Sequence, residues 1–553
     1  MKERLQIMRQ RVRDGKQRAT RQVSAPDVLS ECQAEGLSWP QRAARLTRRM
    51  CEAEQPVVLP DEKILFTRTI PQVSPIFSAE EWGELTKDRT LHELGPISNI
   101  CADWGMVLSQ GLVGRKQTAQ AVKRKYQSDP QAVEFLDCAI ETIDAVLALA
   151  SHYAEEVRRL GRDDLAAILV HTPANPPESF HQALQALRLM HAVLWLSGHY
   201  HVGLGRFDQY MWPYLERDLD MGQLDIPGAE DLLAEFFISL NKDSDLYPGV
   251  QQGDNGQTLT LGGLTRERAD GCNPLTLMAL RVTRDVTMID PKINLRISEN
   301  TDLELLCLAT ELTRKGLGFP QYSNDDVVIP VLVAHGYTLE DACDYTVAAC
   351  WEFILPGKGM EVVNIGAVSF PAAADKGIRM GLRENKDFTD ILEIVNQDIH
   401  EQTDRLVESY QDLLLPPAPY YSVLMHDCLE RGSDLSNGLN YNNFGIHGAC
   451  PANAADALAA VKYHVFEQGS LYPSELLGAL ERNFDGDDSI RELLAAQGPK
   501  VGKNSDLADS LLVMLYEAFA DACEDLEGFL IEVRDGDIEV PEAGLDLICD
   551  RRD

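Results

Sequence analysis

No two cysteines of this 553-residue chain are spaced as Cys-x-x-Cys, although the chain contains twelve cysteines. That spacing is typical of zinc ribbons and iron–sulfur clusters, so the sequence indicates neither and no metal site is expected. The cysteines are most simply free thiols in a reducing cytoplasm, where we expect the protein to reside. The chain also has no HExxH pair, Gly-rich phosphate loop, Walker pattern or Gly-x-Ser-x-Gly elbow, which argues against the common hydrolases and nucleotide-binding proteins.

Positive charge is scarce in this chain. Lys and Arg number 51 against 87 Asp and Glu, which gives a formal net charge of −36. Nucleic acids and anionic membranes are polyanions that would repel such a chain, so we expect neither as a partner. No uninterrupted apolar run of about 18 residues occurs, so no membrane-spanning segment is predicted. Residues 2–21 are locally basic but have no apolar core, and they predict a first helix with a basic face rather than a transit peptide.

The remaining composition is that of a globular protein, with 44% hydrophobic and 25% charged residues. Apolar residues recur at helical spacing over 130–160 and 179–196, which predicts two long helices. Short β-like runs lie between helical patterns, at residues 257–263, 292–297, 326–330 and 345–349. Strands alternating with helices predict an α/β architecture with a largely buried sheet. Residues 524–553 are acidic with little helical periodicity.

The segment Ala349-Cys350-Trp351-Glu352 places a thiol two residues before a carboxylate, just ahead of a turn at Pro356-Gly357. If Cys350 to Glu352 is extended, both side chains leave the same face of the chain, because side chains alternate along a strand. One reactive centre could then meet both groups. A buried structural Cys beside a surface Glu is the commoner meaning of an isolated Cys-x-Glu, because free Cys is among the most buried residue types.

Six separated motifs, in order along the chain, give this pair another meaning. They are Pro176-Pro-Glu-Ser-Phe-His-Gln-Ala-Leu184, Leu204-Gly-Arg-Phe-Asp-Gln-Tyr-Met-Trp-Pro-Tyr214, Leu259-Thr-Leu-Gly-Gly263, Phe319-Pro-Gln-Tyr-Ser-Asn-Asp-Asp-Val-Val-Ile-Pro330, the Cys350 segment and Tyr441-Asn-Asn-Phe-Gly-Ile-His-Gly448. Through them the chain resembles the glycyl radical enzymes, the group of pyruvate formate-lyase and the glycerol- and choline-cleaving lyases. The resemblance covers residues 1–525, which we assign to a pyruvate formate-lyase-like domain, with 526–553 as an acidic tail.

The resemblance implies a fold and a radical chemistry. The fold is a ten-stranded α/β barrel made of two half-barrels and ringed by helices, with Cys350 on a loop at its centre. In the family, a separate activating enzyme that uses S-adenosylmethionine and an iron–sulfur cluster oxidises a backbone glycine to a stable carbon radical. That radical takes a hydrogen atom from the loop Cys, here Cys350, and the resulting thiyl attacks a C–H bond of a small polar substrate. The position of Glu352 is that of the general base of the dehydratase and lyase branches.

The sequence departs from the family in its reactive loop and substrate pocket. The pyruvate formate-lyase type has two adjacent cysteines, whereas Cys350 is single and Glu352 follows, which favours an eliminase, dehydratase or decarboxylase. Asn99 takes the position where relatives commonly carry a His, so no substrate-binding His is assigned there. The resemblance instead suggests substrate-binding roles for four residues, which are His199, His201, Asn324 and Asn364. Ordinary structural roles for the two histidines stay open.

The largest departure concerns the radical itself. Relatives continue for several hundred residues beyond the point that matches Asp525, and there they carry an Arg-Val-x-Gly-Tyr loop with the radical glycine. No such motif occurs here, and Gly536 in an Asp-Gly pair is expected to be a turn glycine. We therefore expect the glycyl radical domain to be absent and the barrel to be incomplete at its C-terminal strands. Open strand edges favour a partner or self-association, and a homodimer is plausible.

Three hypotheses follow for the function. In the first, the chain is a split enzyme that works as a C–C, C–O, C–N or C–S lyase, with the glycyl radical on a second subunit. In the second, it is a truncated or decayed paralogue. In the third, it binds a small metabolite or the activating enzyme without turnover.

Overall fold

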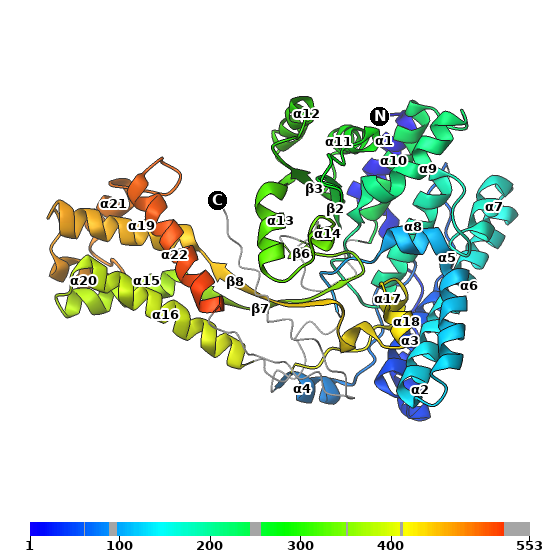
Figure 1. Ribbon diagram of the computed structural model, residues 1–553, viewed down its shortest axis with the longest axis horizontal. Coiled ribbons are helices and arrows are strands. Elements are labelled where there is room, and N and C mark those ends of the chain that lie inside the picture. The colour runs from blue at the N-terminus through cyan, green and yellow to red at the C-terminus, as the bar shows by residue number, and fades with distance from the viewer. Residues whose placement is uncertain (60, 88–96, 244–255, 350–351, 410–412, 525–553) are drawn as a thin grey trace. The chain divides into compact units, whose positions relative to one another are not determined.

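The computed structural model describes residues 1–59, 61–87, 97–243, 256–349, 352–409 and 413–524, with the side chains of 363–365 left aside. These residues form two compact units (Figure 1). The first unit contains residues 1–361 and 414–442, and the second contains 362–413 and 443–524. The predicted boundary at 525/526 falls outside the described residues and stays a prediction.

The first unit is mostly helical. Its helices are α1 (Glu3–Arg13), α2 (Val28–Glu35), α3 (Trp39–Ala53), α4 (Ala79–Lys87), α5 (Trp104–Lys125), α6 (Pro130–Arg159), α7 (Asp163–His171), α8 (Phe180–Leu196), α9 (Phe207–Asp220), α10 (Ile226–Leu240), α11 (Pro274–Val286), α12 (Leu303–Thr313), α13 (Asp325–Ala334), α14 (Leu339–Ala342), α17 (Pro419–Val423) and α18 (Cys428–Arg431). The helices predicted at 130–160 and 179–196 are confirmed as α6 and α8. The first helix predicted over 2–21 is confirmed only in its first part, because α1 ends at Arg13 and a separate 3-10 turn follows at Lys16–Thr20. The basic side chain of Arg4 on α1 pairs with the buried carboxylates of Asp231 and Glu235.

The sheet of the first unit is parallel and has the strand order β1-β2-β3-β4. Its strands are β1 (Gly205–Arg206), β2 (Thr258–Gly262), β3 (Lys292–Ile297) and β4 (Gln321–Asn324), and a parallel bridge between Cys101 and Gly203 extends it beyond β1. The strands predicted at 257–263 and 292–297 are confirmed. The described strands fall into three separate sheets that do not join into a closed barrel, in keeping with the expected incompleteness.

The two faces of this sheet have different chemistry because side chains alternate along each strand. Leu259 and Leu261 of β2, with Ile293 and Leu295 of β3, belong to the hydrophobic core under the helices. The alternate positions, which are Thr258, Thr260, Asn294 and Arg296, are polar and buried. A buried polar face needs hydrogen-bonding partners, and the segment that supplies them carries the candidate site.

One strand prediction is wrong. Residues 326–330 lie in helix α13, and the strand β4 ends just before them at Asn324. The Asn324 side chain caps the helix by accepting a hydrogen bond from the Asp326 backbone N–H at 3.1 Å, and Asp325 and Asp326 occupy the favourable first turn. The β-branched run Val-Val-Ile has the composition of a buried strand, which explains the wrong prediction. The Asn324 cap and the two aspartates favour the start of a helix instead.

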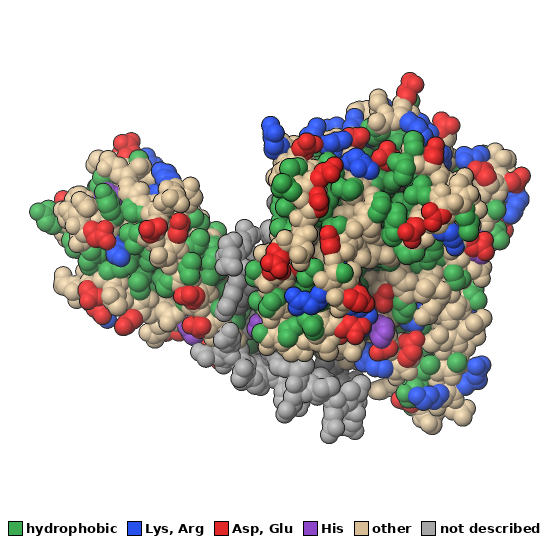
Figure 2. All heavy atoms as spheres, turned by 45° about the horizontal axis from the view of Figure 1, so that its top comes forward, with side chains coloured by type: hydrophobic (Ala, Val, Ile, Leu, Met, Phe, Trp, Pro, Cys, Tyr) green, Lys and Arg blue, Asp and Glu red, His purple; other side chains and the backbone are tan. Residues whose placement is uncertain are grey.

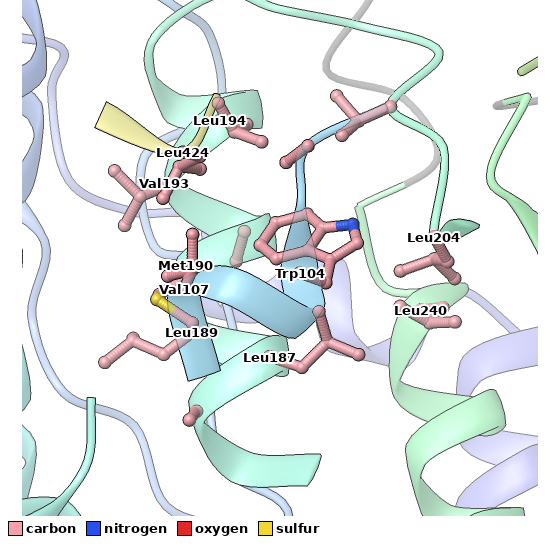
Figure 3. Close-up of a cluster of buried hydrophobic side chains, with 14 of the residues drawn as sticks. Trp104, Val107, Leu187, Leu189, Met190, Val193, Leu194, Leu204, Leu240 and Leu424 are labelled. Atoms are coloured by element: carbon pink, nitrogen blue, oxygen red, sulfur yellow. The ribbon is translucent and has the colours of Figure 1, made fainter. Parts of the chain in front are cut away.

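The core of the first unit gathers around Trp104, at the start of α5. Figure 3 shows its ring among Leu187 and Met190 of α8, with Leu204 and Leu240 on the other side. The indole N–H donates to the Gly203 carbonyl at 3.0 Å, so this large side chain is both buried and hydrogen-bonded. Segments 101–104 and 203–206 are thereby held together at the edge of the sheet.

The second unit contains most of the paired strands β7 (Gly359–Ser369) and β8 (Tyr441–Ala449). Its helices are α15 (Phe370–Arg383), α16 (Phe388–Glu408), α19 (Pro451–Val461), α20 (Pro473–Glu481), α21 (Asp488–Ala496) and α22 (Asp506–Glu524). Phe370 of α15 packs edge-on against Phe519 of α22, with ring centroids 5.7 Å apart. The aromatic contact ties the two helices together within this unit.

The surface carries both signs of charge. Figure 2 shows acidic and basic side chains scattered over the visible face, with hydrophobic atoms between them. Among the helices that the structure describes, none is both long and apolar enough to cross a membrane.

Candidate active site

The candidate site lies on a β-hairpin made of β5 (Thr346–Ala348) and β6 (Glu352–Ile354). The strands are antiparallel, and Ala348 pairs with Glu352. The strand predicted at 345–349 is thus confirmed in its central part. Cys350 and Trp351, which connect the two strands, lie outside the described residues, so the predicted extended conformation of 350–352 remains a prediction.

Glu352 begins the returning strand and is half-buried. Residues directly opposite each other in an antiparallel pair project to the same face, and so do residues two apart in one strand. The Glu352 side chain therefore leaves the same face of the hairpin as Ala348 and Thr346. Thr346 faces strand β2, because its hydroxyl lies 2.6 Å from that of Thr260. The carboxylate thus leaves the hairpin on the side of the polar sheet face.

Two threonines of β2 hold the outgoing strand of the hairpin. The Thr258 hydroxyl donates to the carbonyl of Ala349 at 2.7 Å, and the Thr260 hydroxyl accepts from the Val347 backbone N–H at 3.3 Å. Ala349 is fully buried and has a φ of +56°, in the left-handed region that side chains with a Cβ rarely adopt. The residue just before Cys350 is therefore in a strained conformation that a hydrogen bond from the sheet supports.

The base of the hairpin is anchored by a buried ion pair at the carboxyl end of the sheet. Arg296 of β3 donates two hydrogen bonds to Asp325, at 2.8 and 2.9 Å, and a third to the Tyr345 carbonyl at 2.9 Å. The Tyr345 hydroxyl donates to Asp325 at 2.7 Å, and its ring lies 3.9 Å from the guanidinium carbon. Burial raises the pKa of this hydroxyl, which therefore acts as a neutral donor. Tyr345, which precedes β5, is thus held by its carbonyl, its hydroxyl and its ring.

A second arginine secures the segment just ahead of Tyr345. Arg206 of β1 donates to the Cys343 carbonyl at 3.1 Å and to the Asp344 carboxylate at 3.2 Å. Its other terminal nitrogen donates to the carbonyls of Gly262 and Leu264, each at 3.0 Å. Both buried arginines therefore bind the protein's own groups and position the hairpin.

The chain that leaves the hairpin is docked at Gly357. Its N–H donates to the Cys101 carbonyl at 2.7 Å, and its carbonyl accepts from the His426 N–H at 2.9 Å. A Cβ at this position would lie 2.6 Å from the Cβ of Asp103, and the φ of +73° is also unfavourable for a side chain. Only glycine fits this close approach without displacing a neighbour.

His201 and Asn99 meet near the start of β2. The His201 Nδ1 lies 2.8 Å from the Asn99 Oδ1, and both residues have a positive φ. The His201 ring packs directly against Gly256, two residues before Thr258. Since Thr258 contacts the residue before Cys350, this pair lies at the end of the sheet toward which the hairpin turn points. Asn99 takes the position where relatives commonly carry a His, and in this structure it is the hydrogen-bonding partner of a histidine on another segment.

His199 is placed differently. Its Nδ1 lies 2.8 Å from the Ile97 carbonyl, its ring meets Tyr421 edge-on, and the side chain is buried. Burial lowers its pKa to about 4, so the ring is neutral at pH 7. It lines an apolar cavity of about 290 Å³ together with Phe77, Trp82 and the prolines of segment 416–419. A substrate-binding role for His199 stays a prediction.

The two predicted asparagines also receive places in the fold. Asn324 is exposed and uses its side-chain oxygen to cap α13. Asn364 lies in β7, and its side chain is outside the described residues. The structure thus brings Glu352 to the polar sheet face and His201 to the end of that sheet, whereas Asn324 faces solvent. No cluster of three or more His, Cys, Asp or Glu side chains suited to a metal occurs within the described ranges.

Sequence reasoning missed the groups that hold the hairpin. Thr258 and Arg296 were counted only as strand residues, and Asp325 only as part of a motif. The one available signal was the alternation of polar residues with leucines in 258–262, since polar side chains facing inward on a buried strand require buried partners.

Comparisons with known proteins identify the family of this chain. A family described as Pyruvate formate lyase-like matches residues 78–528. A (2S)-3-sulfopropanediol dehydratase of Klebsiella oxytoca is 27% identical over 492 residues, which cover 81% of this chain and 59% of the relative. A trans-4-hydroxy-L-proline dehydratase of Clostridioides difficile is 25% identical and is matched over 78% of this chain and 60% of the relative. This chain thus spans less than two thirds of the length of either relative.

A solved structure shows the same fold. The B12-independent glycerol dehydratase from Clostridium butyricum matches 95% of this chain and 79% of its own, with a TM-score of 0.81 and 24% identity. The fold is accordingly that of the glycyl radical enzyme barrels, of which the described strands form an unclosed part. Because the family match extends over most of the sequence, this chain belongs to the pyruvate formate lyase-like family, among relatives that are glycyl radical dehydratases and lyases.

Proposed function

We propose that this chain is the hairpin-bearing part of a glycyl radical lyase or dehydratase that acts on a small polar substrate. Cys350 would carry the thiyl radical, and Glu352 would accept a proton from a substrate hydroxyl. The observation that carries the proposal is the β5–β6 hairpin, which has Cys350 in its turn, Glu352 at the start of its returning strand and a polar buried sheet face beside it.

The environment of the hairpin suits this chemistry. Arg206 and Arg296 hold its base, and Thr258 and Thr260 hold its outgoing strand, so the turn is built on rigid elements. A radical at sulfur needs an enclosed site, since exposed sulfur is readily oxidised. Glu352 requires only an ionised carboxylate within hydrogen-bond reach of the proton that it removes.

The radical would come from a glycine on another polypeptide segment, and we propose a second subunit as its source. The glycine radical on that subunit would accept the hydrogen atom of the Cys350 S–H bond, which would leave the unpaired electron on sulfur. A separate activating enzyme that uses S-adenosylmethionine and an iron–sulfur cluster would generate it. Two features support this role. Cys350 is the single cysteine between β5 and β6, and the hairpin is held by hydrogen bonds on both sides, at Tyr345 and at Gly357.

The relatives and the polar face support a small hydroxylated substrate. The relatives' names specify hydroxylated substrates, including a sulfopropanediol and a hydroxyproline. His201, which lies at the end of this face, is our strongest candidate for a contact to a substrate hydroxyl. His199, Asn324 and Asn364 remain weaker proposals. We further propose a cytoplasmic protein that forms a homodimer or pairs with the radical-bearing subunit.

The experiment is anaerobic reconstitution with an activating enzyme and candidate glycine-loop subunits, followed by electron paramagnetic resonance. A carbon-centred doublet together with elimination of water or sulfite from a hydroxylated substrate would support the proposal. Cys350→Ala and Glu352→Gln should abolish turnover and keep the doublet, whereas Cys307→Ala, which removes an exposed thiol, should preserve turnover.

Absence of a doublet with every partner would reject the catalytic proposal. If calorimetry then showed metabolite or activating-enzyme binding that Cys350→Ala does not weaken, the alternative of a non-catalytic binding protein would be favoured.

A further inference from the structure

The hydroxyl of Thr258 donates a hydrogen bond to the backbone carbonyl of Ala349. The hydrogen bond is 2.7 Å long, and both residues are fully buried. The backbone carbonyl of Thr258 accepts from the Leu204 N–H at 2.8 Å, and the residue pairs in register with Lys292 of β3. The side chain that reaches Ala349 thus stands on a strand fixed by both of its neighbours.

Ala349 would not keep its conformation unaided. A left-handed φ is unfavourable for alanine relative to the right-handed region, because its Cβ approaches the following carbonyl. Such residues persist only where their surroundings determine them, and they concentrate at functional sites. Here the surroundings include one specific donor from the side chain of Thr258.

The peptide group that follows Ala349 is planar, so the direction of the Ala349 carbonyl also sets the path by which the chain enters position 350. We propose that Thr258 is a positioning residue that, by holding the Ala349 carbonyl, sets the direction in which the chain enters position 350. The proposal rests on the proposed role of Cys350 for its functional meaning. Its geometry, however, can be tested on the resting protein without any radical.

Thr260 has a different task. Its hydroxyl bonds the side chain of Thr346 and the backbone of Val347, at the start of the strand. It therefore fixes the register of the hairpin along β2. Thr258 acts further along the strand, since its partner Ala349 is the last described residue before Cys350.

The test is the rate at which a small alkylating reagent modifies Cys350, followed by mass spectrometry of the native protein under anaerobic conditions. Thr258→Val removes the hydroxyl at nearly constant volume, and Thr258→Ser restores it. Thr283→Val is the matched control, because the Thr283 hydroxyl is also buried but donates to the carbonyl of Ala279 in its own helix. If the valine variant does not fold, Thr258→Ala gives the same comparison with a smaller side chain.

The other thiols of the chain serve as internal references. Cys307 is exposed, whereas Cys51 and Cys428 are buried in the same unit. We expect Thr258→Val to raise the Cys350 rate relative to Cys307 by about fivefold or more, the factor expected for one buried hydrogen bond. Thr258→Ser and Thr283→Val should stay within about twofold of the wild type.

Two results would overturn the proposal. One is an unchanged Cys350 rate in Thr258→Val, and the other is a parallel rise at Cys51 and Cys428, which would signal general loosening. A failed catalytic proposal remains distinguishable, because it would appear as a missing doublet in the wild type while the alkylation difference persists.

Discussion

His201 and Asn99 are joined by a hydrogen bond of 2.8 Å between imidazole Nδ1 and amide Oδ1, across 102 residues of sequence. An amide oxygen only accepts, so Nδ1 carries the proton and Nε2 of the neutral ring is an acceptor. Under the substrate-binding role that we propose for His201, this tautomer leaves Nε2 to accept a hydrogen bond from a substrate hydroxyl. Asn99 therefore orients His201 in the way that a carboxylate or carbonyl commonly orients a functional histidine.

Asn99→Ala should release the His201 tautomer and lower the free energy of unfolding by about 1 kcal/mol, because a part-buried ring N–H loses its acceptor. Nitrogen chemical shifts of labelled histidine would show the ring passing to a mixture of tautomers. Asn99→Asp keeps the acceptor and should keep Nδ1 protonated. The serine beside it provides the control, since Ser98→Ala removes only a contact to the amide nitrogen of Asn99. Unchanged shifts in Asn99→Ala would refute the assignment.

Gly256→Ala should disturb the same ring from another side. The new Cβ would lie 2.7 to 3.0 Å from three atoms of His201, and the φ of +58° adds a backbone cost. We expect a loss of about 2–4 kcal/mol, made of about 1 kcal/mol for the backbone and the rest for the clash. Gly36→Ala isolates the backbone cost, because Gly36 has a φ of +63° and open space around it. Equal losses by chemical denaturation in both variants would mean that the ring moves away freely.

The features of this site that depend on neighbouring residues can be predicted from the sequence, whereas contacts between segments far apart in the sequence cannot. Strand 292–297 and helix 130–160 follow from local periodicity, and both were predicted. The pairing of Asn99 with His201 joins distant segments, and no pattern in either segment encodes it. Helix α13 was mistaken for a strand because its β-branched residues favour strands locally, while Asn324 and the following aspartates favour a helix start. The family motifs indicated the importance of Arg206 and Asp325, but not that both hold the hairpin.

Loss of one partner of the Arg296–Asp325 pair should lower the free energy of unfolding far more than loss of one partner of an exposed pair. Asp325→Asn leaves the fully buried guanidinium uncompensated, and removal of one partner of a buried pair costs about 3–5 kcal/mol. Glu156→Gln breaks the exposed two-point pair with Arg159 and should cost far less, because solvent screens an exposed pair. Denaturant unfolding of the two variants measures the difference. Similar losses would show that the buried charge finds other compensation, and the hairpin would then not depend on this anchor.

His199 should make the protein sensitive to acid. Its pKa, lowered to about 4 by burial, lies below the ordinary value of about 6.5 that applies in the unfolded chain. Between these values the unfolded state binds more protons, so the free energy of unfolding falls as pH decreases from about 6.5 to 4, by up to about 1.4 kcal/mol per unit. His199→Gln should remove this share of the slope and can still donate to the Ile97 carbonyl. An unaltered slope in His199→Gln would mean that His199 takes up a proton as readily in the folded protein as in the unfolded chain, so that burial does not lower its pKa.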